Sequence, residues 1–173
     1  MATFVELARD LERQEVRYIL IGVWGANFHG PDPSGMFDTE DYDLLLPLEP
    51  ENLLDAWNAC ARSGLTVSAA ERPLAGLMDT VLAERAVEER WPSRASAPPP
   101  GELIVDLSLD IEAFGFESMW AERRIFLVDG VSVSVARLSQ IIRSKAATNR
   151  EQDRQFLATH ADTLRLMLDQ DED

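Results

Sequence analysis

The sequence predicts an α/β fold, in which helices flank a mixed, twisted sheet and a pair of helices closes the C-terminal end. Two kinds of pattern alternate along the chain. Short β-rich apolar runs such as 16–21 and 42–46 are typical of buried strands, whereas 4–14 and 138–145 have apolar residues at helical spacing. At 173 residues and 46% hydrophobic, the chain fits one domain, or one domain with a small helical appendage.

The first two elements are a helix and a strand. Thr3 and Glu6 have the spacing of a capping box, which predicts a helix from there to about Gln14. The run 16–21 predicts a strand, and Gly22 ends it.

The next elements lead from a turn into a second strand. A short helix is expected at 24–28, before glycines and prolines turn the backbone at 30–35. A strand follows at 42–46. Pro50 begins a helix that Gly64 terminates, since proline is tolerated in a first helical turn and glycine just past a last one.

The middle of the chain has weaker patterns. A strand is expected at 65–69 and a helix at 73–90. Prolines at 92 and 98–100 bracket a stretch of small residues, which predicts a loop at 91–101. The run 102–109 is a strand whose alternation places Asp106, Ser108 and Asp110 on one face.

The last third predicts a hairpin and then helices. Asp129-Gly130 separates apolar runs at 125–128 and 131–135, a strong hairpin signal. We expect residues 1–136 to form the core with helices on one side of the sheet, 137–168 to form a helical element of the same domain, and 169–173 to be a solvated acidic tail.

Charge and cysteine content exclude some classes of protein. A net charge of −15 argues against wrapping a nucleic-acid backbone, which needs a basic surface, but not against a small basic pocket for one nucleotide. The single cysteine, Cys60, has no partner for an internal disulfide, so we expect a buried thiol. With no apolar leader and no run of 18 apolar residues, we expect a cytoplasmic protein without membrane contact.

Two aspartates at the start of the strand 42–46 are the main candidates for chemistry. Asp41 and Asp43 share one face of a strand, about 6–7 Å apart at ~3.3 Å per residue. Neighbouring carboxylates repel each other, and a cation between them relieves that repulsion. Mg²⁺ accepts such oxygen ligands together with a substrate phosphate. An acidic cluster before a strand is also a common solvated turn, and this alternative stays open.

Together these segments resemble the nucleotidyltransferase superfamily that has the fold of DNA polymerase β, especially its small bacterial members. These include the minimal nucleotidyltransferases and the toxins of toxin–antitoxin and abortive-infection systems. The resemblance lies in YILIGVWGANFHG (18–30), TEDYDLL (39–45) and LSQIIRSK (138–145), the last followed by Arg150 and Asp153. It covers about 4–168, although 65–101 match nothing in the family.

The resemblance implies a metal site and a nucleotide site. Asp41, Asp43 and Asp106 would bind two Mg²⁺ ions, or Mn²⁺, around a nucleoside triphosphate, and Asp106 would also activate the acceptor hydroxyl. Asp110 is the alternative third carboxylate. The implied nucleotide-binding residues are Gly22, Val23, Thr39 and Lys145. A snorkelling lysine on a helix stripe is an equally good interpretation of Lys145.

Two departures from the family pattern bear on triphosphate binding. Val23 stands where relatives have glycine or serine, and its branched side chain could block the phosphates. Phe37 replaces a basic residue that many relatives have. Of the two histidines, His29 is expected to cap or pack and His160 to lie in the core; the four tryptophans are too scattered for a stacking platform.

The leading functional hypothesis is a Mg²⁺-dependent nucleotidyltransferase that moves a nucleoside monophosphate from an NTP to a hydroxyl. A small molecule or a protein is favoured over RNA as the acceptor, because the chain is acidic. The alternative is a non-catalytic relative that acts as a toxin–antitoxin component or a nucleotide sensor and binds a protein partner. A third hypothesis is an acidic structural protein, in which the aspartates do not converge.

Overall fold

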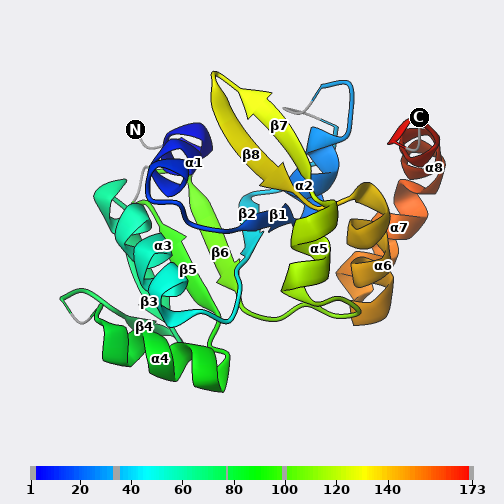
Figure 1. Ribbon diagram of the computed structural model, residues 1–173. Coiled ribbons are helices and arrows are strands. Elements are labelled where there is room, and N and C mark those ends of the chain that lie inside the picture. The colour runs from blue at the N-terminus through cyan, green and yellow to red at the C-terminus, as the bar shows by residue number, and fades with distance from the viewer. Residues whose placement is uncertain (1–2, 33–35, 77, 99–100, 172–173) are drawn as a thin grey trace.

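The protein is described by a computed structural model for residues 3–32, 36–76, 78–98 and 101–171. Within these ranges it forms one eight-stranded sheet and eight helices (Figure 1). The strands are β1 (Ile19–Ile21), β2 (Asp41–Leu45), β3 (Thr66–Ala69), β4 (Arg72–Pro73), β5 (Ser93–Ser96), β6 (Ile104–Ser108), β7 (Arg124–Val128) and β8 (Val131–Val135). The helices are α1 (Phe4–Arg13), α2 (Gly22–Phe28), α3 (Pro50–Arg62), α4 (Thr80–Glu89), α5 (Phe116–Glu122), α6 (Leu138–Thr148), α7 (Glu151–Thr159) and α8 (Ala161–Asp171).

The sheet is mixed, as the sequence predicts. Its strand order is β4-β3-β5-β6-β2-β1-β8-β7. The β2–β6 and β1–β8 pairs are parallel, and the other neighbouring pairs are antiparallel. The central strands β1, β2 and β6 therefore come from distant parts of the chain, and their registers determine which side chains meet.

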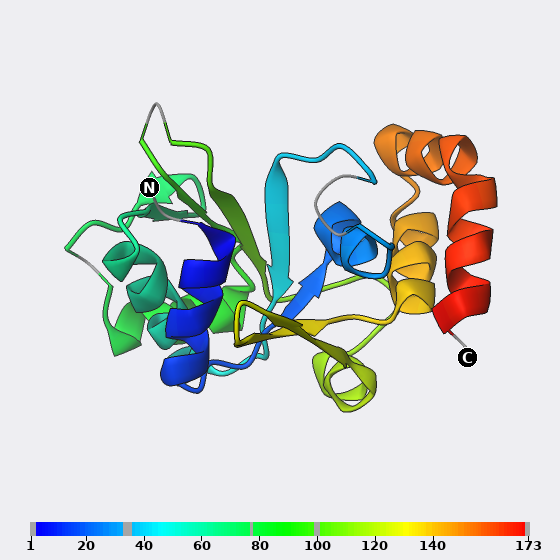
Figure 2. The ribbon, with the colours of Figure 1, turned by 90° about the horizontal axis from the view of Figure 1, so that it is seen from above.

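Helices cover both faces of the sheet, so the expectation of helices on one side is wrong. Figure 2 shows α1, α3 and α4 on one side of the central strands and α2, α6, α7 and α8 on the other. The buried residues divide in the same way: Leu20 and Leu44 belong to the larger core, and Ile19 and Leu45 to a second cluster. Alternation along β1 and β2 sends successive side chains into opposite cores.

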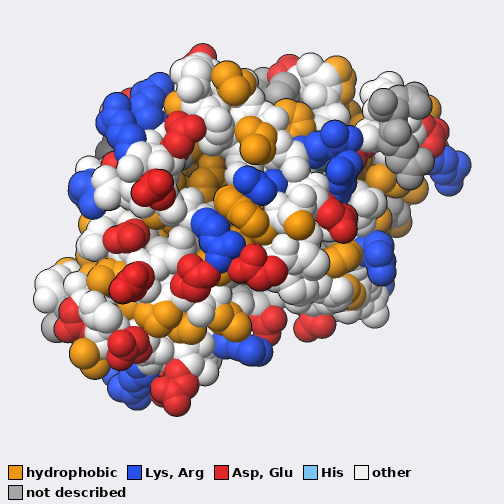
Figure 3. Space-filling view, in the orientation of Figure 1, with side chains coloured by type: hydrophobic (Ala, Val, Ile, Leu, Met, Phe, Trp, Pro, Cys, Tyr) orange, Lys and Arg blue, Asp and Glu red, His pale blue; other side chains and the backbone are white. Residues whose placement is uncertain are grey.

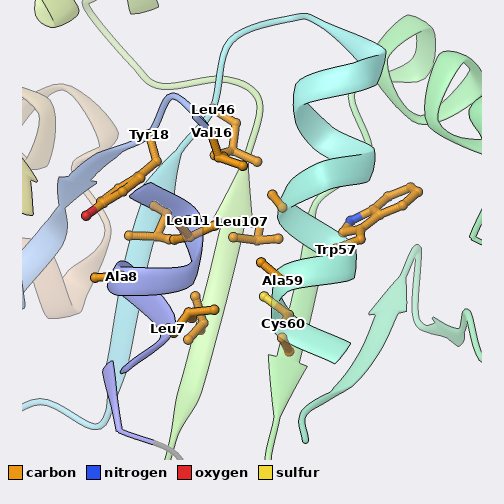
Figure 4. Close-up of a cluster of buried hydrophobic side chains, with 14 of the residues drawn as sticks. Leu7, Ala8, Leu11, Val16, Tyr18, Leu46, Trp57, Ala59, Cys60 and Leu107 are labelled. Carbon is orange, nitrogen blue, oxygen red and sulfur yellow. The ribbon is translucent and has the colours of Figure 1, made fainter. Parts of the chain in front are cut away.

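The larger core joins α1 and α3 to the sheet. In Figure 4, Leu7 and Leu11 of α1 point toward the strands, and Trp57 of α3 belongs to the same buried cluster. The expected capping box starts α1, with Thr3 donating its backbone N–H to Glu6. Cys60 is buried here, as expected, and its burial raises the pKa of its thiol to about 12.

The segment between α3 and β6 differs most from the sequence prediction. The helix expected at 73–90 is reduced to α4, because the backbone turns at Gly76 with φ +74° and Asp79 caps the helix by accepting from Leu82 N–H. The expected loop at 91–101 contains β5, which is hydrogen-bonded to β3 on one side and β6 on the other. Helix α5 was not predicted.

The hairpin at Asp129-Gly130 is confirmed, with φ +50° and +76° at the two turn residues. The final helix expected after 149 is two helices, α7 and α8, which meet at His160. Residues 169–171 belong to α8 instead of a tail, and 172–173 lie outside the described residues. In the described part of the chain, no helix is both long and apolar enough to span a bilayer.

Candidate active site

Three aspartates meet on one face of the sheet. Asp41 and Asp43 are on β2 and Asp106 is on β6, and the parallel register places Asp43 directly beside Asp106. By strand alternation, Asp41 and Asp43 share the face of Leu45, while Tyr42 and Leu44 face the larger core. The structure thus brings together the three predicted metal ligands.

Gly22 makes room for one of these carboxylates. Its φ of +69° is in the left-handed region, which glycine adopts readily. A Cβ at this position would collide with Oδ2 of Asp43. Gly22 is therefore needed where β1 ends, both for its backbone conformation and for the space that Asp43 occupies.

The cluster has an excess of negative charge. Burial, and then the charges of Asp106 and Asp41, raise the pKa of Asp43 from its ordinary value of 3.8 to about 6. Lys145 and Arg150 act in the opposite direction on the same group. The pKa of Asp41 is also raised, first by burial and then by Asp106. A bound cation would relieve this cost.

An arginine that sequence reasoning missed bridges two of the carboxylates. Arg94 of β5 lies opposite Asp106 in the antiparallel β5–β6 pair. Its Nε donates to Asp106 Oδ1 at 2.7 Å and its Nη2 to Asp106 Oδ2 at 2.9 Å. The same Nη2 donates to Asp41 Oδ2 at 3.2 Å. No local pattern indicates this role, because Arg94 meets the aspartates only through strand pairing.

Asp43 and Asp106 border a cavity of about 430 Å³, whereas Asp41 is not among the described residues that line it. Gly22, Asp43 and Asp106 line this cavity, and so do Lys145 and Arg150. Carboxylates and cations therefore face a common space between the sheet and α6. Such an arrangement can hold an anionic ligand together with a cation.

A buried carboxylate holds the two cations in place. Asp153 of α7 has a side chain only 2% exposed, and it accepts from Lys145 Nζ at 3.4 Å and from Arg150 Nε at 2.9 Å. Burial alone would raise the pKa of Asp153, but the Arg150 hydrogen bond and the charge of Lys145 lower it below its usual range. Lys145 is thus both anchored and exposed to the cavity.

Comparison with solved structures supports the fold. An antigenic nucleotidyltransferase-like protein from Paracoccidioides brasiliensis superposes with a TM-score of 0.50 at 17% identity, covering 95% of this chain and 71% of that one. The fold is nucleotidyltransferase-like. The structure of JHP933 from Helicobacter pylori matches at a TM-score of 0.44 and 15% identity, covering 93% of this chain and 65% of that one. No protein-family model matches the chain, and no curated protein does.

Two of the expected nucleotide-binding residues lie elsewhere in this nucleotidyltransferase-like fold. Val23 packs against the second hydrophobic cluster, and Thr39 lines a separate cavity of about 620 Å³. Neither is among the described residues that line the carboxylate cavity. The branched side chain of Val23 is therefore directed into the packing of the second cluster.

Phe37 is a core residue. It is 4% exposed, and its ring lies 5.2 Å from that of Phe156 and 4.7 Å from that of His160. Its backbone N–H donates to Asn27 Oδ1, and its C=O accepts from Asn27 Nδ2, both at 3.0 Å. Asn27, which the sequence did not single out, thereby attaches the segment before β2 to α2.

The remaining candidates have structural partners. Asp110 lines the cavity but also pairs with Arg90 at 3.7 Å. His29 packs, as expected: its Nε2 lies 2.8 Å from the carbonyl oxygen of Ala136, and burial lowers its pKa.

Two of the tryptophans pack in or against the larger core, as expected. The Trp24 ring is stacked on Tyr42 at 4.7 Å, and Phe4 lies 4.2 Å from Tyr42 on its other side. Trp57 is fully buried and donates to Ser93 Oγ at 3.0 Å.

The carboxylates are suitable ligands for a hard cation, but their present arrangement is not that of a metal site. Three carboxylates, two of them with a pKa raised by burial and then by their neighbours, are the ligands that Mg²⁺ takes. Yet across 3–32, 36–76, 78–98 and 101–171, no three His, Cys, Asp or Glu side chains are arranged to hold a metal ion. Arg94 already bonds to Asp41 and Asp106, so their oxygens are directed toward a guanidinium.

Proposed function

We propose that this protein is a metal-dependent nucleotidyltransferase, which transfers a nucleoside monophosphate from an NTP to a hydroxyl acceptor. One observation carries the proposal: Asp43 and Asp106, on two adjacent strands, border the same cavity as two anchored cations. The nucleotidyltransferase-like fold is consistent with this function. In such a transfer the acceptor oxygen bonds to the α-phosphorus, the bond to the β-phosphate oxygen breaks, and pyrophosphate leaves.

The aspartates have two roles in this proposal. Asp41, Asp43 and Asp106 would hold two Mg²⁺ or Mn²⁺ ions, which polarise the α-phosphate and offset the charge of the leaving pyrophosphate. Asp106 also accepts the proton of the acceptor hydroxyl. Gly22 keeps Asp43 in place, since any larger residue would collide with its carboxylate.

The cations would bind the triphosphate. Lys145 and Arg150 line the cavity and are held by the buried Asp153, so their positive ends are placed before a ligand arrives. Pre-placed donors to phosphate oxygens lose less freedom on binding than mobile side chains do.

We propose a small molecule or a protein side chain as the acceptor, in preference to RNA. The net charge is −15, and on the face shown in Figure 3 Lys and Arg side chains are interspersed with Asp and Glu side chains. A nucleic-acid backbone needs concentrated positive charge. An RNA acceptor would therefore require a basic partner protein.

A thermal-shift experiment tests the proposal. Each NTP is added with and without Mn²⁺ or Mg²⁺ to the wild type, to Asp43→Asn and to the matched control Asp129→Asn, which alters an exposed aspartate in the β7–β8 turn. A ligand that binds only the folded state raises the Tm. We expect a metal-dependent rise with one NTP in the wild type and control, and none in Asp43→Asn. Equal rises in all three proteins would refute the assignment of the site.

A second candidate function is favoured by Arg94. A guanidinium that already bridges Asp41 and Asp106 is what a non-catalytic relative would use in place of metal. Such a protein would act as a nucleotide sensor or as one component of a toxin–antitoxin pair. It would show no metal-dependent rise in Tm with any NTP, and labelled NTP would transfer to no acceptor.

A further inference from the structure

Arg94 makes the strongest ionic contacts in the carboxylate cluster. Two parallel hydrogen bonds join its guanidinium to Asp106, at 2.7 and 2.9 Å, and a third reaches Asp41 at 3.2 Å. This bidentate geometry is the tightest way for an arginine to bind a carboxylate. One guanidinium is thus paired with two of the three aspartates.

The guanidinium of Arg94 is also exposed enough to move from the carboxylates into solvent. The Arg94 side chain is 53% exposed, while Asp41 is 34% and Asp106 25% exposed. Ion pairs that reach solvent contribute little net stability, because water and salt compete with them. A partner that carries two positive charges and binds the same oxygens can therefore displace Arg94 without unfolding the strand pair that carries it.

We propose that Arg94 is a resident counter-cation, which occupies the carboxylates until a divalent cation displaces it. The site then alternates between an arginine-paired form and a form in which the guanidinium has swung into solvent. This inference rests on the cation binding in the proposed function and not on the transfer step. Metal can bind only while Arg94 is unpaired, so the apparent affinity for metal is the intrinsic affinity multiplied by the fraction of time that Arg94 is unpaired.

Mn²⁺ binding tests the exchange without any measurement of activity. The free Mn²⁺ signal in electron paramagnetic resonance gives the Kd for the wild type and for Arg94→Ala. Arg165→Ala is the control, since it removes the same charge from an exposed position on α8, a helix far from β5 in Figure 1.

Arg94→Ala is expected to bind Mn²⁺ at least about tenfold more tightly than the wild type. A tenfold difference corresponds to a wild type in which Arg94 is paired about nine-tenths of the time. Arg165→Ala should stay within about twofold of the wild type. Arg94→Lys should lie between, because it keeps the charge and loses the bidentate fork.

The outcomes separate the two proposals. Equal or weaker Mn²⁺ binding by Arg94→Ala overturns the exchange but leaves a metal-binding site. If neither the wild type nor Arg94→Ala binds Mn²⁺ while circular dichroism shows both folded, the exchange and the metal-dependent function both fail.

A second measurement uses only the wild type, in case Arg94→Ala does not fold. The Nε–H of Arg94 donates to Asp106, so its ¹⁵N–¹H resonance reports on that bond directly. Titration with Mg²⁺ should shift this resonance toward that of a free arginine. A resonance that stays unchanged while the backbone amides of β2 respond to Mg²⁺ would show that Arg94 remains paired, and would overturn the proposal.

Discussion

Replacing Asp43 with asparagine should stabilise the protein at neutral pH. Asp43 is held beside two other carboxylates, and burial and their charges raise its pKa from 3.8 to about 6. Keeping this group ionised therefore costs free energy in the folded state. Asparagine has nearly the same shape and carries no charge, so it removes the cost while keeping the side chain in place beside Gly22.

The size of the effect follows from the pKa difference. One pKa unit corresponds to about 1.4 kcal/mol, so the difference between 3.8 and about 6 corresponds to about 3 kcal/mol at pH 7. Since burying the amide retains part of the desolvation cost, we expect Asp43→Asn to gain about 2 kcal/mol in the free energy of unfolding.

The pH dependence has a definite sign. Between pH 4 and pH 6 the folded state binds more protons at Asp43 than the unfolded state does, so this group lowers stability as the pH rises through that window. Above pH 6 the cost is constant, and below about pH 4 it disappears. The advantage of Asp43→Asn should therefore be largest at pH 7 and small at pH 4.

Urea denaturation followed by circular dichroism, with a chelator present, measures this difference at each pH. Asp129→Asn makes the same chemical change at an exposed turn residue, and so controls for the altered net charge. A destabilised Asp43→Asn, or an advantage that is the same at pH 4 and pH 7, would refute the electrostatic reasoning for this site.

Three further predictions concern the surroundings of Asp43. Gly22→Ala should cost about 2 kcal/mol or more, from an alanine at positive φ and from its collision with Asp43; stability equal to the wild type in urea denaturation would contradict this. Asn27→Ala should cost about 2 kcal/mol, since two buried backbone groups of Phe37 lose their partners; a loss below about 0.5 kcal/mol by the same assay would argue against it. Lys145→Met should raise the pKa of Asp43 above about 6, because Lys145 now lowers it; a ¹³C carboxyl titration by NMR that gave an unchanged or lower pKa would show that the lysine does not act on this group.

The acidic structural protein is the least supported of the three functional hypotheses. That hypothesis required the aspartates to stay apart, whereas Asp41 and Asp106 share one guanidinium and Asp43 lies beside Asp106 in the sheet. The structure also gives Phe37 a different role from the one that the sequence suggested, which was a missing positive charge near the phosphates. Phe37 is packed in the second core, so it contributes to the position of β2 and not to the charge of the cavity.

The sequence by itself determined the local features. The capping box of α1, the proline start of α3 and the Asp129-Gly130 hairpin depend on residues only a few positions apart, so their signals are complete in the sequence. The shared face of Asp41 and Asp43 follows in the same way from the two-residue period of a strand.

Only the tertiary structure decided the contacts between distant segments. Ser-Arg-Ala-Ser of β5 has no apolar alternation, and it becomes a strand because β3 and β6 supply hydrogen-bonding partners on both sides. That pairing places Arg94 opposite Asp106, and the parallel β2–β6 register places Asp106 beside Asp43. Strand register is set by packing across the whole sheet, so no window of the sequence contains it. Asp41 and Asp43 could be proposed from their spacing and Asp106 from the family resemblance, but the arginine that pairs with Asp41 and Asp106 could not be found in either way.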